Sequence, residues 1–339
     1  MIYIHVPFCR SFCVYCDFYS EAGCKESAMA SYIDCLNDEI RSRRDEIFRT
    51  LDTNTLYIGG GTPSVMPLPF FDAILQALPV KSFDEFTVEV NPDDIVTRGK
   101  DFCISLKALG VNRISMGVQS FDDSVLRWMR RRHDSARAEE AYRILRESGF
   151  DNISLDLIFG VGGMSMESLE RSICKLLELR PEHISAYQLS VEEGTPLDRM
   201  YQSGEYIPAD EEECSAQYCL ICERLRDAGY RHYEISNWAL PGRESRHNSA
   251  YWARVPYVGL GPGAHSFGIG EDGSQIRSWN SQALSGWKSE SEILSPEEIR
   301  EEQIMLGLRR EEGTLVDGKA VRIPEDKWFV SDAIIRELI

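Results

Sequence analysis

Residues 4–20 read IHVPFCRSFCVYCDFYS and hold cysteines at positions 9, 13 and 16, directly after an apolar run typical of a β-strand. Four thiolates would close a zinc site or complete the ligation of a four-iron cluster, whereas three leave one metal position open. The spacing therefore predicts a 4Fe-4S cluster bound by Cys9, Cys13 and Cys16, with one iron free for an exchangeable ligand. Two alternatives stay open: three buried thiols, or a zinc loop that borrows a distant fourth ligand.

Six short β-rich runs alternate with helical stretches from this motif to about residue 190. The runs are residues 2–8, 55–60, 85–91, 113–119, 152–160 and 183–190. Such an alternation predicts right-handed crossovers and a mostly parallel sheet. A closed eight-stranded barrel would need two more units, which the later sequence does not supply in the same pattern. We therefore expect an α/β fold, a six-unit partial (β/α)6 TIM-like barrel with a C-terminal α+β extension.

The pattern changes after residue 190, and three regions are expected. Residues 1–190 form the partial barrel, and residues 191–290 form an α+β extension with a helix around 209–228 and a hairpin signal at Asp272-Gly273. Residues 291–339 form a short helical C-terminal region, opened by a capping box between Ser295 and Glu298.

Glycines and polar residues interrupt or follow the strand runs where a buried strand would not place them. They are the glycines 59–61, Glu89, Gln119, Asp156 and, further along the chain, Arg131. Barrel enzymes build their sites from polar groups that converge at the carboxyl ends of parallel strands. These residues are therefore predicted to share one site.

Composition limits the partners and the cellular location that can be expected for the protein. The formal charge of −18 is spread along 339 residues without a basic stripe, which disfavours nucleic acid as a partner. No signal peptide and no apolar run of membrane-spanning length is evident, so we expect no transmembrane segment and a cytoplasmic location, with the ten cysteines reduced.

The cysteine motif, with aromatic residues between its cysteines, resembles that of the radical S-adenosylmethionine (SAM) superfamily. The segments YIHVPFC, GGGTP, VEVNP, GVQSF and DLIFG, in this order, resemble its branch of oxygen-independent coproporphyrinogen III dehydrogenases and HemW-type haem chaperones, over roughly residues 1–310. The resemblance implies that the open iron binds the methionine moiety of SAM. It assigns cofactor contacts to Tyr3, Gly60, Gly61, Thr62, Glu89, Gln119, Arg131 and Asp156.

Two features separate the chain from the dehydrogenases within this branch. Those enzymes carry an additional cysteine where this sequence has Phe18, and an extension before the first strand. The segment RHNSAYW, residues 246–252, instead matches the HNxxYW element of HemW-like proteins. His247 is a candidate iron ligand for haem, beside the flat rings of Tyr251 and Trp252, although a histidine that caps a loop over an aromatic core fits equally well.

The resemblance therefore implies a haem chaperone that binds a 4Fe-4S cluster, SAM and haem as cargo, with an electron donor and a haem-acceptor protein as partners. The alternative is an enzyme, a coproporphyrinogen III dehydrogenase that acts by radical chemistry in porphyrin biosynthesis. A plain electron-transfer protein would leave the polar strand ends unexplained. A second cysteine pair, Cys219 and Cys222, falls on one face of a predicted helix and is expected to be buried rather than redox-active.

Overall fold

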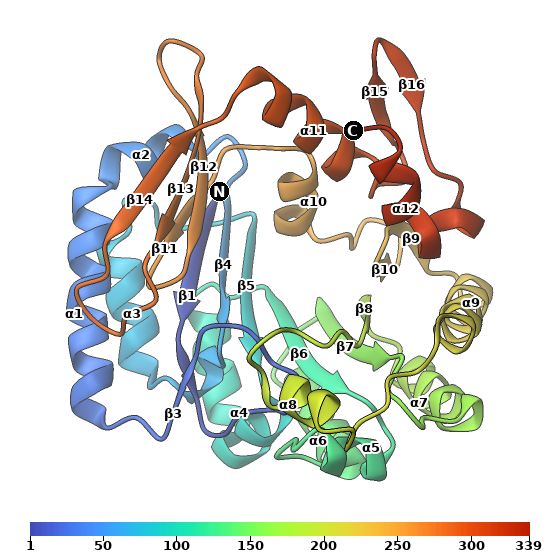
Figure 1. Cartoon of the computed structure of the whole chain (residues 1–339). Coiled ribbons are helices and arrows are strands. Elements are labelled where there is room, and N and C mark those ends of the chain that lie inside the picture. The colour runs from blue at the N-terminus through green and yellow to red at the C-terminus, as the bar shows by residue number, and fades with distance from the viewer.

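The computed structural model describes all 339 residues, and a nine-stranded sheet organises it (Figure 1). In spatial order its strands are β11 (Val258–Leu260), β1 (Ile2–Val6), β4 (Thr55–Gly60), β5 (Glu85–Val90), β6 (Arg113–Gln119), β7 (Ile153–Phe159), β8 (His183–Gln188), β10 (Asn237–Ala239) and β9 (Arg231–Glu234). The strands from β11 to β8 run parallel, and β10 pairs antiparallel with β8 on one side and with β9 on the other. The predicted six parallel units, from β1 to β8, are confirmed.

Helices connect the parallel strands and cover the outside of the curved sheet (Figure 1). They are α1 (Glu26–Ser42), α2 (Arg44–Arg49), α3 (Leu68–Ala77), α4 (Pro92–Ala108), α5 (Asp123–Trp128), α6 (Ser135–Glu147) and α7 (Met166–Leu179). Helix α6 is followed by Gly149 at φ +90°, a left-handed conformation that suits glycine at the end of a helix. One face of each strand packs on these helices, which leaves the concave face for a site.

Residues 191–290 extend the main sheet as well as packing on it. The segment contributes β11 beside β1 and the pair β10 and β9 beside β8. It also holds α8 (Pro196–Gln202), α9 (Glu211–Asp227), α10 (Arg246–Trp252) and most of an antiparallel sheet of β12 (His265–Ile269), β13 (Gln275–Asn280) and β14 (Ser289–Ile293). The last of these strands continues past residue 290. The turn between β12 and β13 contains Asp272-Gly273, as the hairpin signal predicts.

The C-terminal region shares the hydrophobic core of the barrel, because Trp328 and Ile335 belong to the same buried cluster as the sheet residues. Its elements are α11 (Pro296–Gly307), β15 (Thr314–Val316), β16 (Lys319–Val321), η2 (Glu325–Val330) and α12 (Ser331–Arg336). The capping box between Ser295 and Glu298 is present at the start of α11. None of the helices combines the length and apolar composition that crossing a lipid bilayer requires.

One buried carboxylate ties the extension to the first helix of the barrel. Glu39 of α1 accepts hydrogen bonds from the Gly261 backbone N–H at 2.8 Å, from Asn280 Nδ2 at 2.8 Å and from Trp287 Nε1 at 2.9 Å. Arg43 pairs with Glu39 and donates to the Gly259 carbonyl at 2.8 Å. Because hydrogen bonds to charged groups are the stronger ones, this cluster holds β11 against β1.

Candidate functional site

A cavity of about 440 Å³ opens on the concave face of the sheet. All the predicted cluster and cofactor residues except Tyr3 and His247 line it: Cys9, Cys13, Cys16, Gly60, Gly61, Thr62, Glu89, Gln119, Arg131 and Asp156. Its volume falls within the range of about 300–1,000 Å³ that is usual for small-molecule sites. The parallel sheet thus brings together residues that lie up to 147 positions apart in the chain.

The cysteine loop is fixed at both of its sides. Its first part forms the short strand β2 (Phe8–Cys9), which pairs with β3 (Glu21–Ala22). In its middle, the buried Val14 donates its N–H to the Met129 carbonyl at 3.3 Å and accepts from the Leu197 N–H at 2.8 Å. The three cysteines are free and partly exposed, so their sulfur atoms are available to a metal.

The glycine-rich segment packs directly against the strand that leads into the cysteine loop. The N–H of Gly61 donates to the Val6 carbonyl at 2.8 Å, and the N–H of Thr62 donates to the Phe8 carbonyl at 2.8 Å. A Cβ atom on Gly61 would lie 2.8 Å from the Phe8 carbonyl oxygen, and one on Gly60 would lie 2.6 Å from the His5 ring. Contacts within the protein therefore already require these two glycines, before any ligand is considered. The segment continues into the short helix η1 (Pro63–Val65).

Two largely desolvated carboxyl groups line the cavity, Glu89 on β5 and Asp156 on β7, with β6 between them. Glu89 accepts hydrogen bonds from Tyr57 Oη at 2.7 Å and from the Gly60 N–H at 3.1 Å, and burial raises its pKa to about 7. Burial likewise raises the pKa of Asp156 to about 6, against the hydrogen bond from Ser185. A cationic or hydroxyl-bearing ligand would stabilise both carboxylates, because its hydrogen bonds would replace those to the water they have lost.

A distortion of β6 aims Gln119 into the cavity. The register of β6 with β7 shifts between Met116 and Gln119, and Gln119 adopts φ +70°, which is uncommon for a residue with a side chain. Arg131 reaches the same place from the loop after α5, where its Nη1 donates to Cys13 Sγ at 3.3 Å and its Nη2 donates to the Gly117 carbonyl. Its Nε atom is buried and has no partner, so this guanidinium retains a donor for a ligand.

Arg113 is a cavity residue that the sequence reasoning missed. It begins β6, is 1% exposed, and its Nε atom has no hydrogen-bond partner. Its charge opposes the rise in the pKa values of both Glu89 and Asp156. The signal was the strand period of two, because Arg113, Ser115, Gly117 and Gln119 alternate with buried apolar residues and all line the cavity.

Tyr3 lies in the layer behind the cavity wall. Its hydroxyl is 3.0 Å from His5 Nδ1, and its ring centre is 6.1 Å from that of Tyr57, which does line the cavity. Tyr3 is therefore placed to support Tyr57, which in turn hydrogen-bonds Glu89.

His247 does not reach the cavity, in contrast to its predicted role as a haem ligand. It is 1% exposed in α10, with Nδ1 2.8 Å from Thr55 Oγ1 and Nε2 3.1 Å from Tyr251 Oη. Its N–H donates to Glu85 Oε1 at 2.9 Å, so the strand residue Glu85 caps the helix that carries it. Burial lowers the pKa of His247 to about 3, and both ring nitrogens are used inside the protein. This arrangement fits the alternative of a histidine over an aromatic core.

We expect His247→Ala to lower the free energy of unfolding by about 2–4 kcal/mol, because it leaves a cavity and removes the partners of Thr55 and Tyr251. Urea unfolding measures this loss. Haem affinity per folded chain should stay at the wild-type value. A variant of unchanged stability with an altered haem absorption spectrum would instead support ligation of haem iron by this residue.

Comparison with known proteins assigns the family. The profile of the Radical SAM superfamily matches residues 3–176, slightly more than half of the chain. The protein named Heme chaperone HemW of Lactococcus lactis is 35% identical over 323 residues, which cover 93% of this chain and 83% of that protein. The chain belongs to the HemW family of radical SAM proteins. Heme chaperone HemW of Bacillus subtilis is similar to the same degree, at 35% identity over 92% of this chain and 83% of that protein.

The fold of this HemW-family chain is also found in a solved structure. Coproporphyrinogen III oxidase (HemN) from Escherichia coli, described as a radical SAM enzyme, superposes with a TM-score of 0.75 at 20% identity. The match covers 92% of this chain and 75% of that one, and it supports the partial-barrel fold alone.

The superfamily is defined by a 4Fe-4S cluster and SAM, and the cavity fits both groups. Three free cysteines on one fixed loop face a cavity that also contains two carboxyl groups. The unpartnered Nε of Arg131 and the unpartnered Nε of Arg113 indicate that the protein does not satisfy this polar lining by itself.

Proposed function

We propose that this chain is a haem chaperone, which uses a 4Fe-4S cluster and SAM as resident cofactors and holds haem for transfer to an acceptor protein. The relatives named Heme chaperone HemW support the proposal, since they match nearly the whole chain. The observation that carries it is a rim of aromatic side chains around the cavity. Phe12 is 49% exposed, Phe18 is 66% exposed and Tyr187 is 43% exposed, and all three line the cavity.

Cys9, Cys13 and Cys16 would hold the cluster, and Thr62 Oγ1, 3.3 Å from Cys9 Sγ, supports the first of these ligands. When bound, the cluster supplies an electron for cleavage of the sulfonium of SAM. Glu89, oriented by Tyr57 and the Gly60 N–H, would accept hydrogen bonds from the ammonium group of the cofactor. Arg131 would bind its carboxylate, and Gln119 and Asp156 would bind its ribose hydroxyls.

Exposed phenyl rings beside a polar cavity are unusual for a free surface and suit a flat apolar ligand such as a porphyrin. Arg130, which also lines the cavity, is exposed and makes no ion pair. It is therefore free to meet a propionate group, whereas the overall charge of −18 would not attract one. Phe18 occupies the position at which the dehydrogenases carry a cysteine, so the same residue separates the two functions.

The proposal includes a cytoplasmic location, an electron donor and a haem-acceptor protein.

The test is a haem titration of the anaerobically reconstituted protein. The double variant Phe12→Ala/Phe18→Ala is expected to bind haem about 10–100-fold more weakly than the wild type, because two stacking surfaces are removed. Phe48→Ala, which removes a phenyl ring of similar exposure on α2, is the matched control and should bind haem normally.

Coproporphyrinogen III consumption is measured in parallel on the same samples. A protein that binds no haem but consumes this substrate would be a dehydrogenase, and the proposal would be wrong. Equal haem affinity in both the double variant and the control would remove the aromatic rim from the proposed site.

A further inference from the structure

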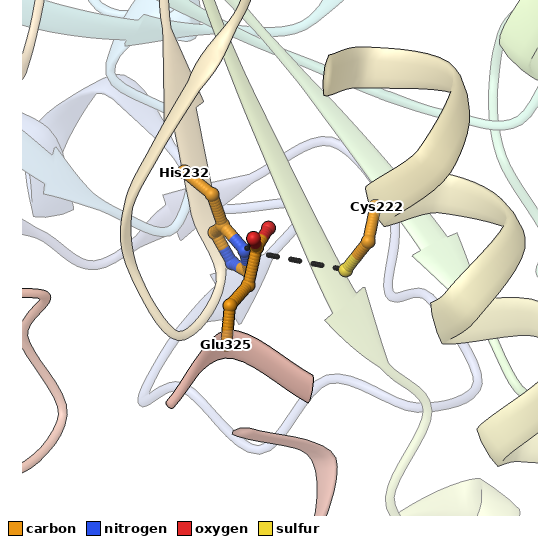
Figure 2. Close-up of side chains that lie close together, drawn as sticks. All are labelled: Cys222, His232 and Glu325. Carbon is orange, nitrogen blue, oxygen red and sulfur yellow. Dashed lines mark hydrogen bonds and ion pairs between the residues drawn. The ribbon is translucent and has the colours of Figure 1, made fainter. Parts of the chain in front are cut away.

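A second group of side chains of the kinds that bind metals lies outside the cavity, where α9, β9 and η2 meet. Cys222 on α9, His232 on β9 and Glu325 at the start of η2 point toward one another (Figure 2). Their donor atoms all lie within 4.8 Å of one another. His232 Nδ1 is 4.0 Å from Cys222 Sγ and 3.0 Å from Glu325 Oε1.

We propose that Cys222, His232 and Glu325 form a zinc site that fastens the C-terminal region to the end of the main sheet. A thiolate, an imidazole and a carboxylate are the three ligand types that zinc takes in proteins. Zinc bonds of about 2.0–2.3 Å in a tetrahedral site place the donor atoms about 3.3–3.6 Å apart. The two distances at His232 Nδ1 lie on either side of this range, so small side-chain movements would suffice.

The surroundings of His232 fit a metal ligand. Its second nitrogen, Nε2, lies 3.4 Å from the Ile235 carbonyl oxygen, and a backbone carbonyl at this position is a common partner of metal-bound histidines. The ring stacks on Trp238 with centres 3.9 Å apart and meets the edge of Trp328 at 4.3 Å, so its orientation is fixed. Burial lowers the pKa of His232, which keeps the imidazole neutral as coordination requires.

The charges of the site balance on zinc binding. Burial raises the pKa of the Cys222 thiol to about 12, so the thiol keeps its proton in the metal-free protein. Zinc would displace this proton to solvent, and the proton on His232 would lie on Nε2, toward Ile235. One thiolate and one carboxylate then neutralise Zn²⁺. Glu325, which also lies 3.6 Å from the exposed Arg226, has a side chain 38% exposed, so the site is accessible from solvent.

The same geometry argues against a nucleophilic cysteine. In such a site the base would contact the thiol through one ring nitrogen and its orienting carboxylate through the other. Here Cys222 and Glu325 both face Nδ1 of His232. Convergence on one atom is the arrangement of ligands around a common metal position.

The test uses the cluster-loaded protein under anaerobic conditions. The protein is dialysed first against zinc and then against a chelator that removes loosely bound metal. Metal analysis is expected to find one tightly held zinc in addition to the cluster iron. X-ray absorption at the zinc edge should show one sulfur at about 2.3 Å and nitrogen or oxygen ligands at about 2.0–2.1 Å. Three sulfur ligands would place the zinc at Cys9, Cys13 and Cys16 and would overturn the proposal, as would a wild-type protein that retains no zinc.

Substitutions locate the site. Cys222→Ser should weaken zinc binding about 100-fold or more, and Glu325→Gln, which changes a partly exposed residue and preserves its shape, about tenfold. Cys219→Ser alters an exposed cysteine one turn away on the same helix and should leave zinc affinity unchanged. Wild-type affinity in Cys222→Ser and Glu325→Gln, or an equal loss in Cys219→Ser, would contradict the assignment. Should Cys222→Ser fail to fold, Glu325→Gln and the absorption data decide the question.

Discussion

The triple variant Cys9→Ser/Cys13→Ser/Cys16→Ser is expected to hold no iron–sulfur cluster after anaerobic reconstitution, whereas the wild type should hold about four irons per chain. The three cysteines are the only ones that line the cavity, and their loop is fixed by backbone hydrogen bonds on both sides of Val14. Serine preserves the size of each side chain, so the loop itself should keep its conformation. Iron and sulfide analysis with electron paramagnetic resonance measures the outcome.

The matched control replaces three cysteines outside the cavity, Cys24, Cys35 and Cys174, with serine. This variant should reconstitute like the wild type. A cluster that persists in the first variant, or a reconstituted wild type that contains zinc instead of iron at these cysteines, would rule out the proposed ligands.

The second large effect is expected for Glu89→Gln, which should weaken SAM binding about 100-fold while leaving the cluster intact. Glu89 lines the cavity, is largely desolvated and is held by Tyr57 and Gly60, so its charge is available to an ammonium group. Equilibrium dialysis on cluster-loaded protein measures the affinity. Asp84→Asn, at an exposed position just before the same strand, serves as the control.

The same substitution should change how stability without ligand depends on pH. The pKa of Glu89 is about 7 in the folded chain, above its ordinary value of 4.5. Between these values the folded state binds a proton that the unfolded state has released, so stability falls as the pH rises through this window. Glu89→Gln cannot release this proton, so it avoids the loss of stability. Its free energy of unfolding should exceed that of the wild type by up to about 3 kcal/mol at pH 8, but by little at pH 4.

Asp156 faces the same cavity and its pKa is raised as well. It therefore also makes stability fall as the pH rises, in the wild type and in Glu89→Gln alike. Arg113 opposes both shifts and is likewise unchanged. Chemical unfolding of the wild type and Glu89→Gln at the two pH values therefore measures the contribution of Glu89, including its repulsion with Asp156. Parallel stability curves for the two proteins, together with unchanged SAM affinity, would mean that Glu89 has only a structural role.

The sequence predicted the parts of the fold and site that depend on local patterns. Six strand runs and the CxxxCxxC spacing are each readable within about ten residues, and the order of parallel strands follows from their crossovers. Gln119 and Asp156 could be predicted as site residues for the same reason, because a polar residue in a buried strand is conspicuous in the sequence. Arg113 was missed although the period of two in β6 contained the signal.

Longer-range features could not be read in this way. β11 and β10 have three residues each, too few for a period to appear, and they pair with strands that are distant in the chain. The position of His247 depends on Thr55, 192 residues earlier. Cys222 was expected to be buried together with Cys219, yet only Cys222 is buried, and its partner Glu325 lies more than a hundred residues later.

The pairing of β1 with both β4 and β11 affects the order in which the protein can form during synthesis. Residues 2–4 leave the ribosome well before residues 258–260, which are their neighbours on one side. Until these emerge, one edge of β1 lacks hydrogen-bond partners and is open to pairing with other chains. The cysteine loop directly follows this strand, so the nascent chain exposes its metal-binding thiols before the wall that shields them is complete. The iron–sulfur centre is therefore expected to assemble after the extension has been translated. A chain truncated before residue 258 would keep both the unpaired edge of β1 and the unshielded thiols.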